Sequence, residues 1–212
     1  MRTRPFNPAV ATQIHRQQAK GLPGTVGVYL TDLASGQSAS LNPTATFYGA
    51  STLKVPIAMT VLWLVGQNRL TLDETIAYRP EEFQAGTGTL QATVRPGQRI
   101  AVRRLLDLMI TVSDNIARNI LERFIGSGTI RRYMRSIGVT PPYDPAKLPA
   151  GVAVANKIGT WPGQVHDIGL VYAPDRSFAL SVFTRGIPEA QAEAAIATMA
   201  AAIYGYMDAL AG

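Results

Sequence analysis

Residues 47–59 read Phe-Tyr-Gly-Ala-Ser-Thr-Leu-Lys-Val-Pro-Ile-Ala-Met and combine a loop-to-helix boundary with a serine and a lysine. Serine is a favoured N-cap, so we expect a helix to begin near Ser51 and to end around Asn68. Lys54 follows three residues later, which places both side chains on one helix face. A lysine there can accept the proton of a serine hydroxyl and make it a nucleophile. By itself, the short S-x-x-K pattern is more often a capping serine followed by a surface lysine.

Length and composition indicate one ordinary globular domain. The chain has 212 residues, of which 47% are hydrophobic and 16% charged. That length supports one buried core, so we expect a single domain over residues 1–212. No continuous apolar run approaches the roughly 18 residues of a membrane span, and none is expected. Arg2 and Arg4 are not followed by an apolar segment, so we expect no signal peptide in this sequence.

The residue types limit the chemistry that the chain can perform. It has no cysteine, which excludes a thiol nucleophile and thiolate metal sites. His15 and His166 are far apart, so the sequence disfavours a histidine metal site and a Ser-His-Asp triad. We expect no metal and no cofactor. The net charge of +6 comes from scattered arginines rather than from a basic stripe, so nucleic-acid binding is a weak alternative.

Hydrophobic periodicity and turn residues divide the chain into helices and strands. We expect helices over residues 7–20, 51–68, 102–113, 116–124, 130–137 and 188–211, and strands over residues 25–30, 38–41, 152–160, 165–173 and 178–184. Residues 71–98 are rich in turn formers and are predicted to form loops that flank a groove. The proline-rich residues 141–145 are interpreted as a linker.

This order of elements predicts an α/β fold of the α+β type. The five strands most simply form one antiparallel sheet, with the terminal helices on one face and the helical middle on the other. We expect residues 1–46 and 151–212 to form the α/β part and residues 47–150 to form a small helical subdomain.

Two further motifs follow Ser51 and Lys54. Ser113-Asp114-Asn115 interrupts an apolar helical pattern, and Lys157-Ile158-Gly159-Thr160 ends an expected strand. The motifs S-x-x-K, S-D-N and K-T-G occur together in class A β-lactamases and penicillin-binding proteins. All three are present here in that order, with Ile158 in place of the threonine of the third motif.

The chain therefore resembles the class A β-lactamase-like and penicillin-binding serine hydrolases. The similarity includes residues 47–57, 86–90, 105–120 and 157–185, together with the order of the terminal helices. It implies a β-lactamase/transpeptidase-like fold, an acyl-enzyme and a small-molecule substrate, either a β-lactam or derived from peptidoglycan. It also implies a periplasmic or secreted protein that acts in β-lactam breakdown and antibiotic resistance.

The resemblance implies catalytic roles for four residues. Ser51 resembles the acylated nucleophile, and Lys54 resembles the base that takes its proton. Ser113 would pass the proton to the leaving nitrogen. Lys157 would polarise the Ser113 hydroxyl and lower the pKa of Lys54.

The resemblance also implies how substrate is held. The backbone N–H groups of Ser51 and Thr160 would form the oxyanion hole. Asn115 would hydrogen-bond the amide side chain of the substrate, and Gly159 and Thr160 would complete the substrate-binding strand. Asp114 is assigned to structure, because its carboxylate can tie loops together through backbone N–H groups.

The segment between the second and third motifs departs from the family pattern. Residues 116–156 number 41, far fewer than ordinary class A β-lactamases have there. That family carries in this region the Ω-loop with the glutamate that activates the deacylating water. Glu122 and Asp144 are the acidic residues of this segment, and neither stands in a similar context. Glu81 and Glu82 are alternative positions for such a base.

Ile158 is the second departure, because the family's hydroxyl at this position helps to bind the substrate carboxylate. Thr160, Arg185 or Lys157 are the candidates to replace it. We therefore expect a serine acyl hydrolase that is acylated at Ser51 by β-lactams or related amides and is slow to deacylate. A D,D-peptidase or small esterase, and a penicillin-binding sensor in which acylation is the endpoint, remain alternatives.

Overall fold

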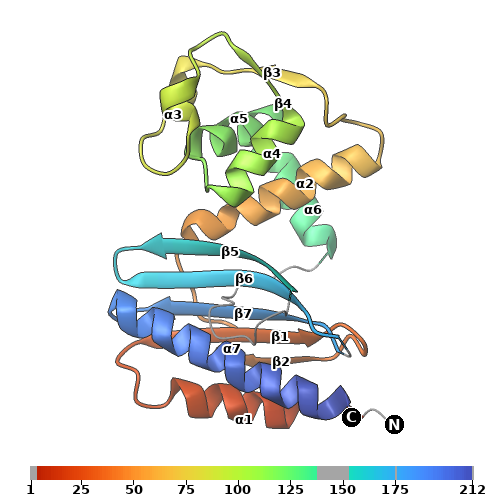
Figure 1. The fold of residues 1–212 in the computed structure, drawn as a ribbon, viewed down its shortest axis with the longest axis vertical. Helices are drawn as coiled ribbons and strands as arrows, with labels where there is room; N and C mark the ends of the chain where they lie inside the picture. Colours follow the sequence, from red (N-terminus) through yellow and green to blue (C-terminus); the bar gives the residue numbers. More distant parts are fainter. Residues whose placement is uncertain (1–3, 138–152, 175, 212) are drawn as a thin grey trace. The chain divides into compact units, whose positions relative to one another are not determined.

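Five strands form one antiparallel sheet in a computed structural model that describes residues 4–137, 153–174 and 176–211 (Figure 1). Every pair of neighbouring strands is antiparallel, so the predicted sheet is confirmed. Its strands in sheet order are β2 (Ser38–Leu41), β1 (Thr25–Asp32), β7 (Phe178–Arg185), β6 (Gln164–Tyr172) and β5 (Ala153–Trp161).

The chain divides into two compact units. The sheet unit comprises Met1–Thr52 and Thr140–Gly212, and the helical unit comprises Leu53–Val139. Each unit has its own buried apolar cluster. The predicted linker at residues 141–145 lies outside the described residues.

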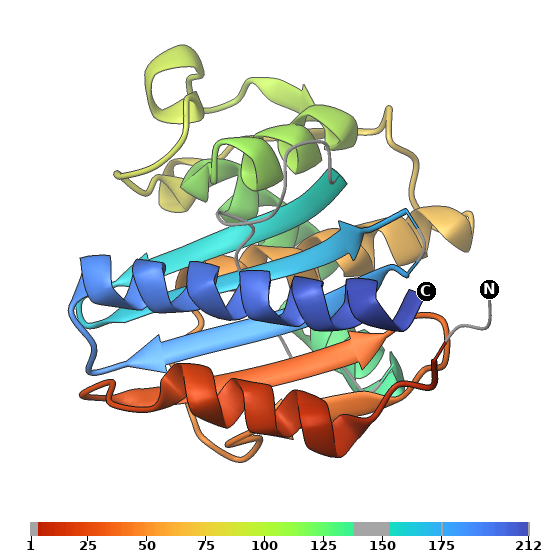
Figure 2. The ribbon, with the colours of Figure 1, turned by 60° about the horizontal axis from the view of Figure 1, so that its bottom comes forward.

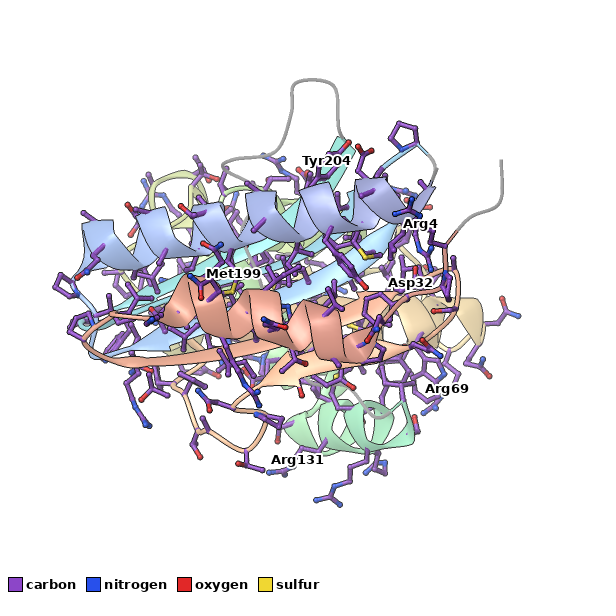
Figure 3. The ribbon with its side chains drawn as sticks, turned by 90° about the horizontal axis from the view of Figure 1, so that it is seen from below. Arg4, Asp32, Arg69, Arg131, Met199 and Tyr204 are labelled. Atoms are coloured by element: carbon purple, nitrogen blue, oxygen red, sulfur yellow. The ribbon has the colours of Figure 1, made fainter. Side chains whose placement is uncertain are left out.

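The terminal helices α1 (Pro8–Ala19) and α7 (Glu189–Ala211) lie side by side on one face of this sheet (Figure 2). The side chain of Asn7 caps α1 by accepting hydrogen bonds from the backbone N–H groups of Ala9 and Val10. Met199 of α7 lies in the core that the two helices close over the strands (Figure 3). Further members of this core are Val28, Leu30, Val171, Phe178, Leu180, Ile196 and Ile203.

Helix α7 is the one helix of the described chain that is long and apolar enough to cross a membrane. The prediction of no membrane-spanning segment considered only continuous apolar runs, whereas α7 reaches this composition through its many alanines. Its residues Ala192, Ile196, Met199 and Ile203 are buried in the core of the sheet unit. Packing against the sheet therefore accounts for its apolar composition.

The helical unit contains the predicted middle helices. They are α2 (Lys54–Gly66), α4 (Val102–Thr111), α5 (Asn115–Ile125) and α6 (Ser127–Ile137). Their apolar faces form the second core, which includes Ile57, Val61, Leu105, Met109, Ile116 and Ile120. The single residue Gly126, at φ +76°, separates α5 from α6, so α6 begins earlier than the predicted start at residue 130.

The predicted helix start at Ser51 is wrong. Residues Ala50–Leu53 form the 3-10 helix η1, and α2 begins at Lys54. Leu53 occupies the N-cap position of α2 and makes no side-chain capping bond. A 3-10 turn commonly precedes an α-helix, and sequence periodicity does not distinguish the two over four residues.

Residues 71–98 contain regular secondary structure, whereas loops were predicted there. They contain β3 (Thr75–Ala77), η2 (Pro80–Glu82) and α3 (Leu90–Thr93), and β3 pairs with β4 (Arg99–Ala101) in a second, two-stranded sheet. Strands of three residues are too short to show an alternating pattern, which explains why the sequence did not indicate them.

His15 of α1 is fully buried, and within the described chain neither of its ring nitrogens has a hydrogen-bond partner. Burial lowers the pKa of His15 from 6.5 to about 4, because the charged imidazolium is poorly solvated there. The folded state therefore holds His15 neutral, whereas the unfolded chain protonates it near pH 6.5. Its contribution to stability is complete above pH 6.5 and is lost as the pH falls toward 4.

We expect His15→Leu to remove part of the acid sensitivity of folding. At about 1.4 kcal/mol per pKa unit, the wild-type chain should lose about 3 kcal/mol more than the variant between pH 7 and pH 4. Urea unfolding of both chains at several pH values measures this difference. Gln17→Leu, at an exposed position of the same helix, is the control and should follow the wild type. Parallel pH curves for wild type and His15→Leu would contradict the assignment.

Candidate active site

Ser51 lies in the tight turn η1 of the sheet unit. The residue before it, Ala50, has a φ of +44°, in the left-handed region that non-glycine residues rarely occupy. The Thr52 backbone N–H donates to the Gly49 carbonyl at 3.0 Å, and the Thr52 hydroxyl donates to the same oxygen. These bonds close the turn around Ser51.

Strand β5 packs directly against this turn at Gly159. A Cβ atom at Gly159 would lie 2.7 Å from Cγ2 of Thr52 and 3.0 Å from the carbonyl oxygen of Gly49. Such distances are shorter than real Cβ contacts, so only glycine fits. The structure thus brings the third motif beside the Ser51 turn within the sheet unit.

Lys157 lies on the same face of β5 as Gly159, because alternate residues of a strand share a face. Its side chain is 8% exposed, and Nζ donates to the Ile158 carbonyl at 3.0 Å. Burial lowers the pKa of Lys157, although the carboxylate of Asp167 acts in the opposite direction. Ile158 is 47% exposed and Thr160 is also exposed, so neither side chain serves the core.

In the helical unit, the structure brings together Lys54, Ser113 and Asn115. Lys54 is 3% exposed. Its Nζ donates to the Ser113 carbonyl at 2.8 Å, to Ser113 Oγ at 3.0 Å and to Asn115 Oδ1 at 2.8 Å. A buried ammonium group needs such partners, because leaving it unpaired would cost several kcal/mol.

Asp114 fixes the geometry of the second motif. Its buried carboxylate accepts hydrogen bonds from the backbone N–H groups of Thr89 at 2.7 Å, Leu90 at 2.8 Å and Ala117 at 3.0 Å. The bond to Ala117 caps α5, and the other two tie down the loop before α3. The predicted structural role of Asp114 is therefore confirmed. The neighbouring Ser113 has a φ of +54°.

Thr87 is a site residue that the sequence did not indicate. Its hydroxyl donates to the Ser113 carbonyl at 2.7 Å and lies 3.5 Å from Asn115 Oδ1. The backbone N–H of Asn115 donates in return to the Thr87 carbonyl at 3.2 Å. Thr87 stands between two glycines in residues 86–90, a segment that the family resemblance included but to which no role at the site was assigned.

Two polar residues of β6 hold the segment that leads to Ser51. His166 Nε2 donates to the Tyr48 carbonyl at 2.8 Å, and Nδ1 accepts from the Thr184 backbone N–H at 3.3 Å. Burial lowers the pKa of His166, which agrees with a neutral ring that donates from one nitrogen and accepts at the other. Gln164 Oε1 accepts from the Tyr48 backbone N–H at 3.0 Å. The available signal in the sequence was a histidine within an expected strand.

The candidate deacylating acids occupy other roles among the described residues. Glu122 is paired with Arg118 at 2.6 Å along α5. Glu82 is buried and is bound to Arg123, and its carboxylate also accepts from the Arg79 backbone N–H at 2.7 Å. Asp144 lies outside the described residues.

A last acid, Glu81, is 64% exposed and lies 3.8 Å from Arg79. Within the described part of the chain, no group of three or more histidine, aspartate and glutamate residues is placed to hold a metal ion.

Comparisons with known proteins show the family to which the chain is similar. A family model described as "Beta-lactamase enzyme family" matches residues 9–143 and 140–207. The β-lactamase of Streptomyces albus G is 28% identical over 118 residues, which are 53% of this chain and 38% of that protein. The chain thus spans about two-fifths of the length of the curated relatives it matches.

Solved structures show the same fold. A structure of PBP-A has a TM-score of 0.84 and 23% identity, and covers 98% of each chain. A variant of PBP-A, described as an acyl-enzyme complex with penicillin G, has a TM-score of 0.82 and 22% identity, with coverage of 98% and 99%. The predicted β-lactamase/transpeptidase-like fold is therefore confirmed.

We expect Asp114→Ala to destabilise the helical unit by about 3 kcal/mol, because it leaves buried N–H groups without acceptors. Asp114→Asn keeps one acceptor oxygen and should cost less. Asp107→Ala, at an exposed position of α4, is the matched control and should change stability by less than about 0.5 kcal/mol. Urea unfolding measures all three. Equal stability of Asp114→Ala and Asp107→Ala would refute the anchoring role.

Proposed function

Because the chain belongs to the β-lactamase enzyme family, we propose that it is a serine hydrolase acylated at Ser51 by β-lactams or related amides. The observation that carries the proposal is the Lys54 side chain, whose Nζ lies 3.0 Å from Ser113 Oγ and 2.8 Å from Asn115 Oδ1. An amine and a hydroxyl in direct contact can pass a proton between them. Acylation requires such proton transfer twice, when the serine hydroxyl attacks and when the leaving nitrogen departs.

In the proposed first step, the Lys54 ammonium group first releases a proton to solvent. Ser51 Oγ then attacks the carbonyl carbon of the substrate, and its proton passes to the resulting neutral amine of Lys54. The carbonyl oxygen gains a negative charge. The backbone N–H groups of Ser51 and Thr160 would stabilise that charge, each at roughly 3–4 kcal/mol as measured for such donors elsewhere. The close approach of Gly159 to the Ser51 turn supports this role, because it holds β5 beside the nucleophile.

In the proposed second step, the bond between carbonyl carbon and nitrogen breaks and the leaving nitrogen takes a proton from Ser113 Oγ. Lys54 returns its proton to Ser113, which leaves an ester at Ser51. The hydrogen bond between Lys54 and Ser113 supports this relay. Lys157 would polarise the Ser113 hydroxyl, and Asn115 would bind the amide of the acyl side chain.

Among the three candidates, we propose Thr160 as the contact for the substrate carboxylate. Thr160 is an exposed residue that directly follows Gly159, which is consistent with that role. Arg185 already donates to the Thr46 carbonyl at 2.6 Å and lies over the Phe47 ring at 5.6 Å, which disfavours it. Lys157 is largely buried and donates to a backbone carbonyl.

We further propose that hydrolysis of the acyl-enzyme is slow. Glu122 lies seven residues after Asn115 on α5, which is roughly 10 Å along the helix axis and beyond hydrogen-bond reach. Its ion pair with Arg118 supports a structural role. Loss of a general base typically slows a step by about 10²–10⁴-fold. Among the described residues, we propose Lys54 as the group that activates water.

A penicillin-binding D,D-peptidase, esterase or sensor is the second candidate. The likeness to PBP-A over 98% of both chains favours it, since the curated β-lactamases are matched over only about two-fifths of their length. The PBP-A variant described as an acyl-enzyme complex with penicillin G is consistent with acylation by a penicillin in this fold. The two candidates share acylation at Ser51. They differ in whether β-lactams are the substrate that is slowly hydrolysed, or whether the protein acts on another substrate or stops at the acyl-enzyme.

We expect Ser51→Ala to abolish labelling by a fluorescent penicillin while leaving the fold intact, because the change removes a single oxygen atom. Gel fluorescence measures the label, and circular dichroism checks the fold. Ser136→Ala, at an exposed position of α6, serves as the control and should label like wild type. Undiminished labelling of Ser51→Ala would remove Ser51 from the mechanism.

We expect nitrocefin to give a burst of about one equivalent per protein followed by slow turnover, because acylation outpaces deacylation. Glu122→Gln and Glu81→Gln should leave both phases unchanged. Stopped-flow absorbance measures burst and turnover. Fast turnover without a burst, lost in one of these two variants, would instead reveal a carboxylate base and a true β-lactamase.

A further inference from the structure

Two aromatic side chains of the sheet unit are paired on its surface rather than in its core. The rings of Tyr48 and Trp161 have centroids 5.0 Å apart and planes tilted by 52°. Their exposed fractions are 52% and 53%, and neither residue belongs to the buried cluster of the sheet unit. Large aromatic rings that remain half exposed are typical of binding surfaces.

The pair borders the Ser51 turn. Trp161 lies on the same face of β5 as Lys157 and Gly159, because side chains alternate along a strand. Gly159 is the residue that packs against the turn. Tyr48 precedes Ser51 by three residues. One ring therefore comes from each of the two segments that meet at Gly159.

The backbone beneath the pair is also held in place. Both backbone polar groups of Tyr48 are hydrogen-bonded to β6, the N–H to Gln164 Oε1 at 3.0 Å and the carbonyl to His166 Nε2 at 2.8 Å. Trp161 is paired with Gln164 as the last residue pair of the β5–β6 hairpin. Fixed aromatic rings bind an apolar group at low entropic cost, because little freedom remains to be lost.

We propose that Tyr48 and Trp161 form an apolar subsite for an aromatic or bulky apolar substituent on the acyl part of the substrate. The proposal rests on the proposed acylation at Ser51 with the Thr160 N–H on the carbonyl oxygen. Trp161 follows Thr160, whose N–H would bind the oxygen of the reacting carbonyl. Its ring would therefore lie beside the substituent that is attached next to that carbonyl. Acyl donors with an aryl side chain are then preferred over donors without one.

The test compares two penicillins that share the reacting ring and differ in the acyl side chain. Benzylpenicillin carries a phenylacetyl group, and 6-aminopenicillanic acid carries none. Acylation rate constants are measured by quenching and mass spectrometry for wild type, Tyr48→Ala and Trp161→Ala. Tyr172→Ala, which is likewise half exposed on β6, and Phe83→Ala in the helical unit are the matched controls.

We expect each site variant to lower the rate constant for benzylpenicillin by about tenfold or more, as for the loss of a well-filled apolar contact. The rate constant for 6-aminopenicillanic acid should change by less than about threefold. Tyr48→Phe and Trp161→Phe should retain most of the preference, because they keep a ring. Both control variants should behave as wild type toward both penicillins.

Other outcomes overturn the subsite and are distinguishable from failure of the proposed function. Equal loss with both penicillins would mean that the rings only shape the Ser51 turn. Unchanged rates in the alanine variants would mean that the rings contact no substrate. Absence of an adduct with either penicillin in the wild-type chain would overturn the proposed acylation itself, and the subsite with it.

Discussion

The burial of one ammonium group constrains the helical unit more than any other interaction in it. Lys54 begins α2 and donates to two oxygens of Ser113 and to Asn115 Oδ1. Because an unpaired charge in the interior is very costly, these acceptors must be held at the right distance. Asp114 meets that need by anchoring the backbone between the two acceptor residues. A charge at the start of one helix thus determines the conformation of the loop before another.

In the sheet unit, the corresponding constraint is steric. The Ser51 turn and β5 approach so closely at Gly159 that no side chain fits between them. His166 and Gln164 fix the segment that leads to this turn, because they hydrogen-bond the backbone of Tyr48. Gly159 of β5 and the pair Gln164 and His166 of β6 belong to one hairpin. The position of Ser51 therefore depends on the register of β5 and β6.

Much of this structure could be predicted from the sequence, for identifiable reasons. The sheet, the long helices and the grouping of Lys54 with Ser113 and Asn115 follow from clear periodicity and from three motifs in a known order. Asp114 was expected to tie loops together through backbone N–H groups, and the structure shows that it also caps α5. The start of α2 was misplaced because a 3-10 turn and an α-helical turn have the same residue preferences over four positions.

Other features depend on contacts between residues distant in sequence, which no local pattern records. Thr87 joins the second motif from a loop 26 residues away. His166 reaches the Tyr48 carbonyl across a separation of 118 residues. Strands β3 and β4 are stabilised by pairing with each other. Each has only three residues, which are too few to show an alternating pattern in the sequence. The motifs therefore pointed to side chains of which several lie together in the structure, but they did not point to the residues that support them.

The backbone at Ser113 sets stability against chemistry. Its φ of +54° belongs to the left-handed region, which glycine adopts readily and in which serine is strained by about 1 kcal/mol or more. Replacement by glycine would relieve that strain and also delete the hydroxyl beside Lys54. The most stable residue at this position is therefore one that could not exchange a proton with the amine.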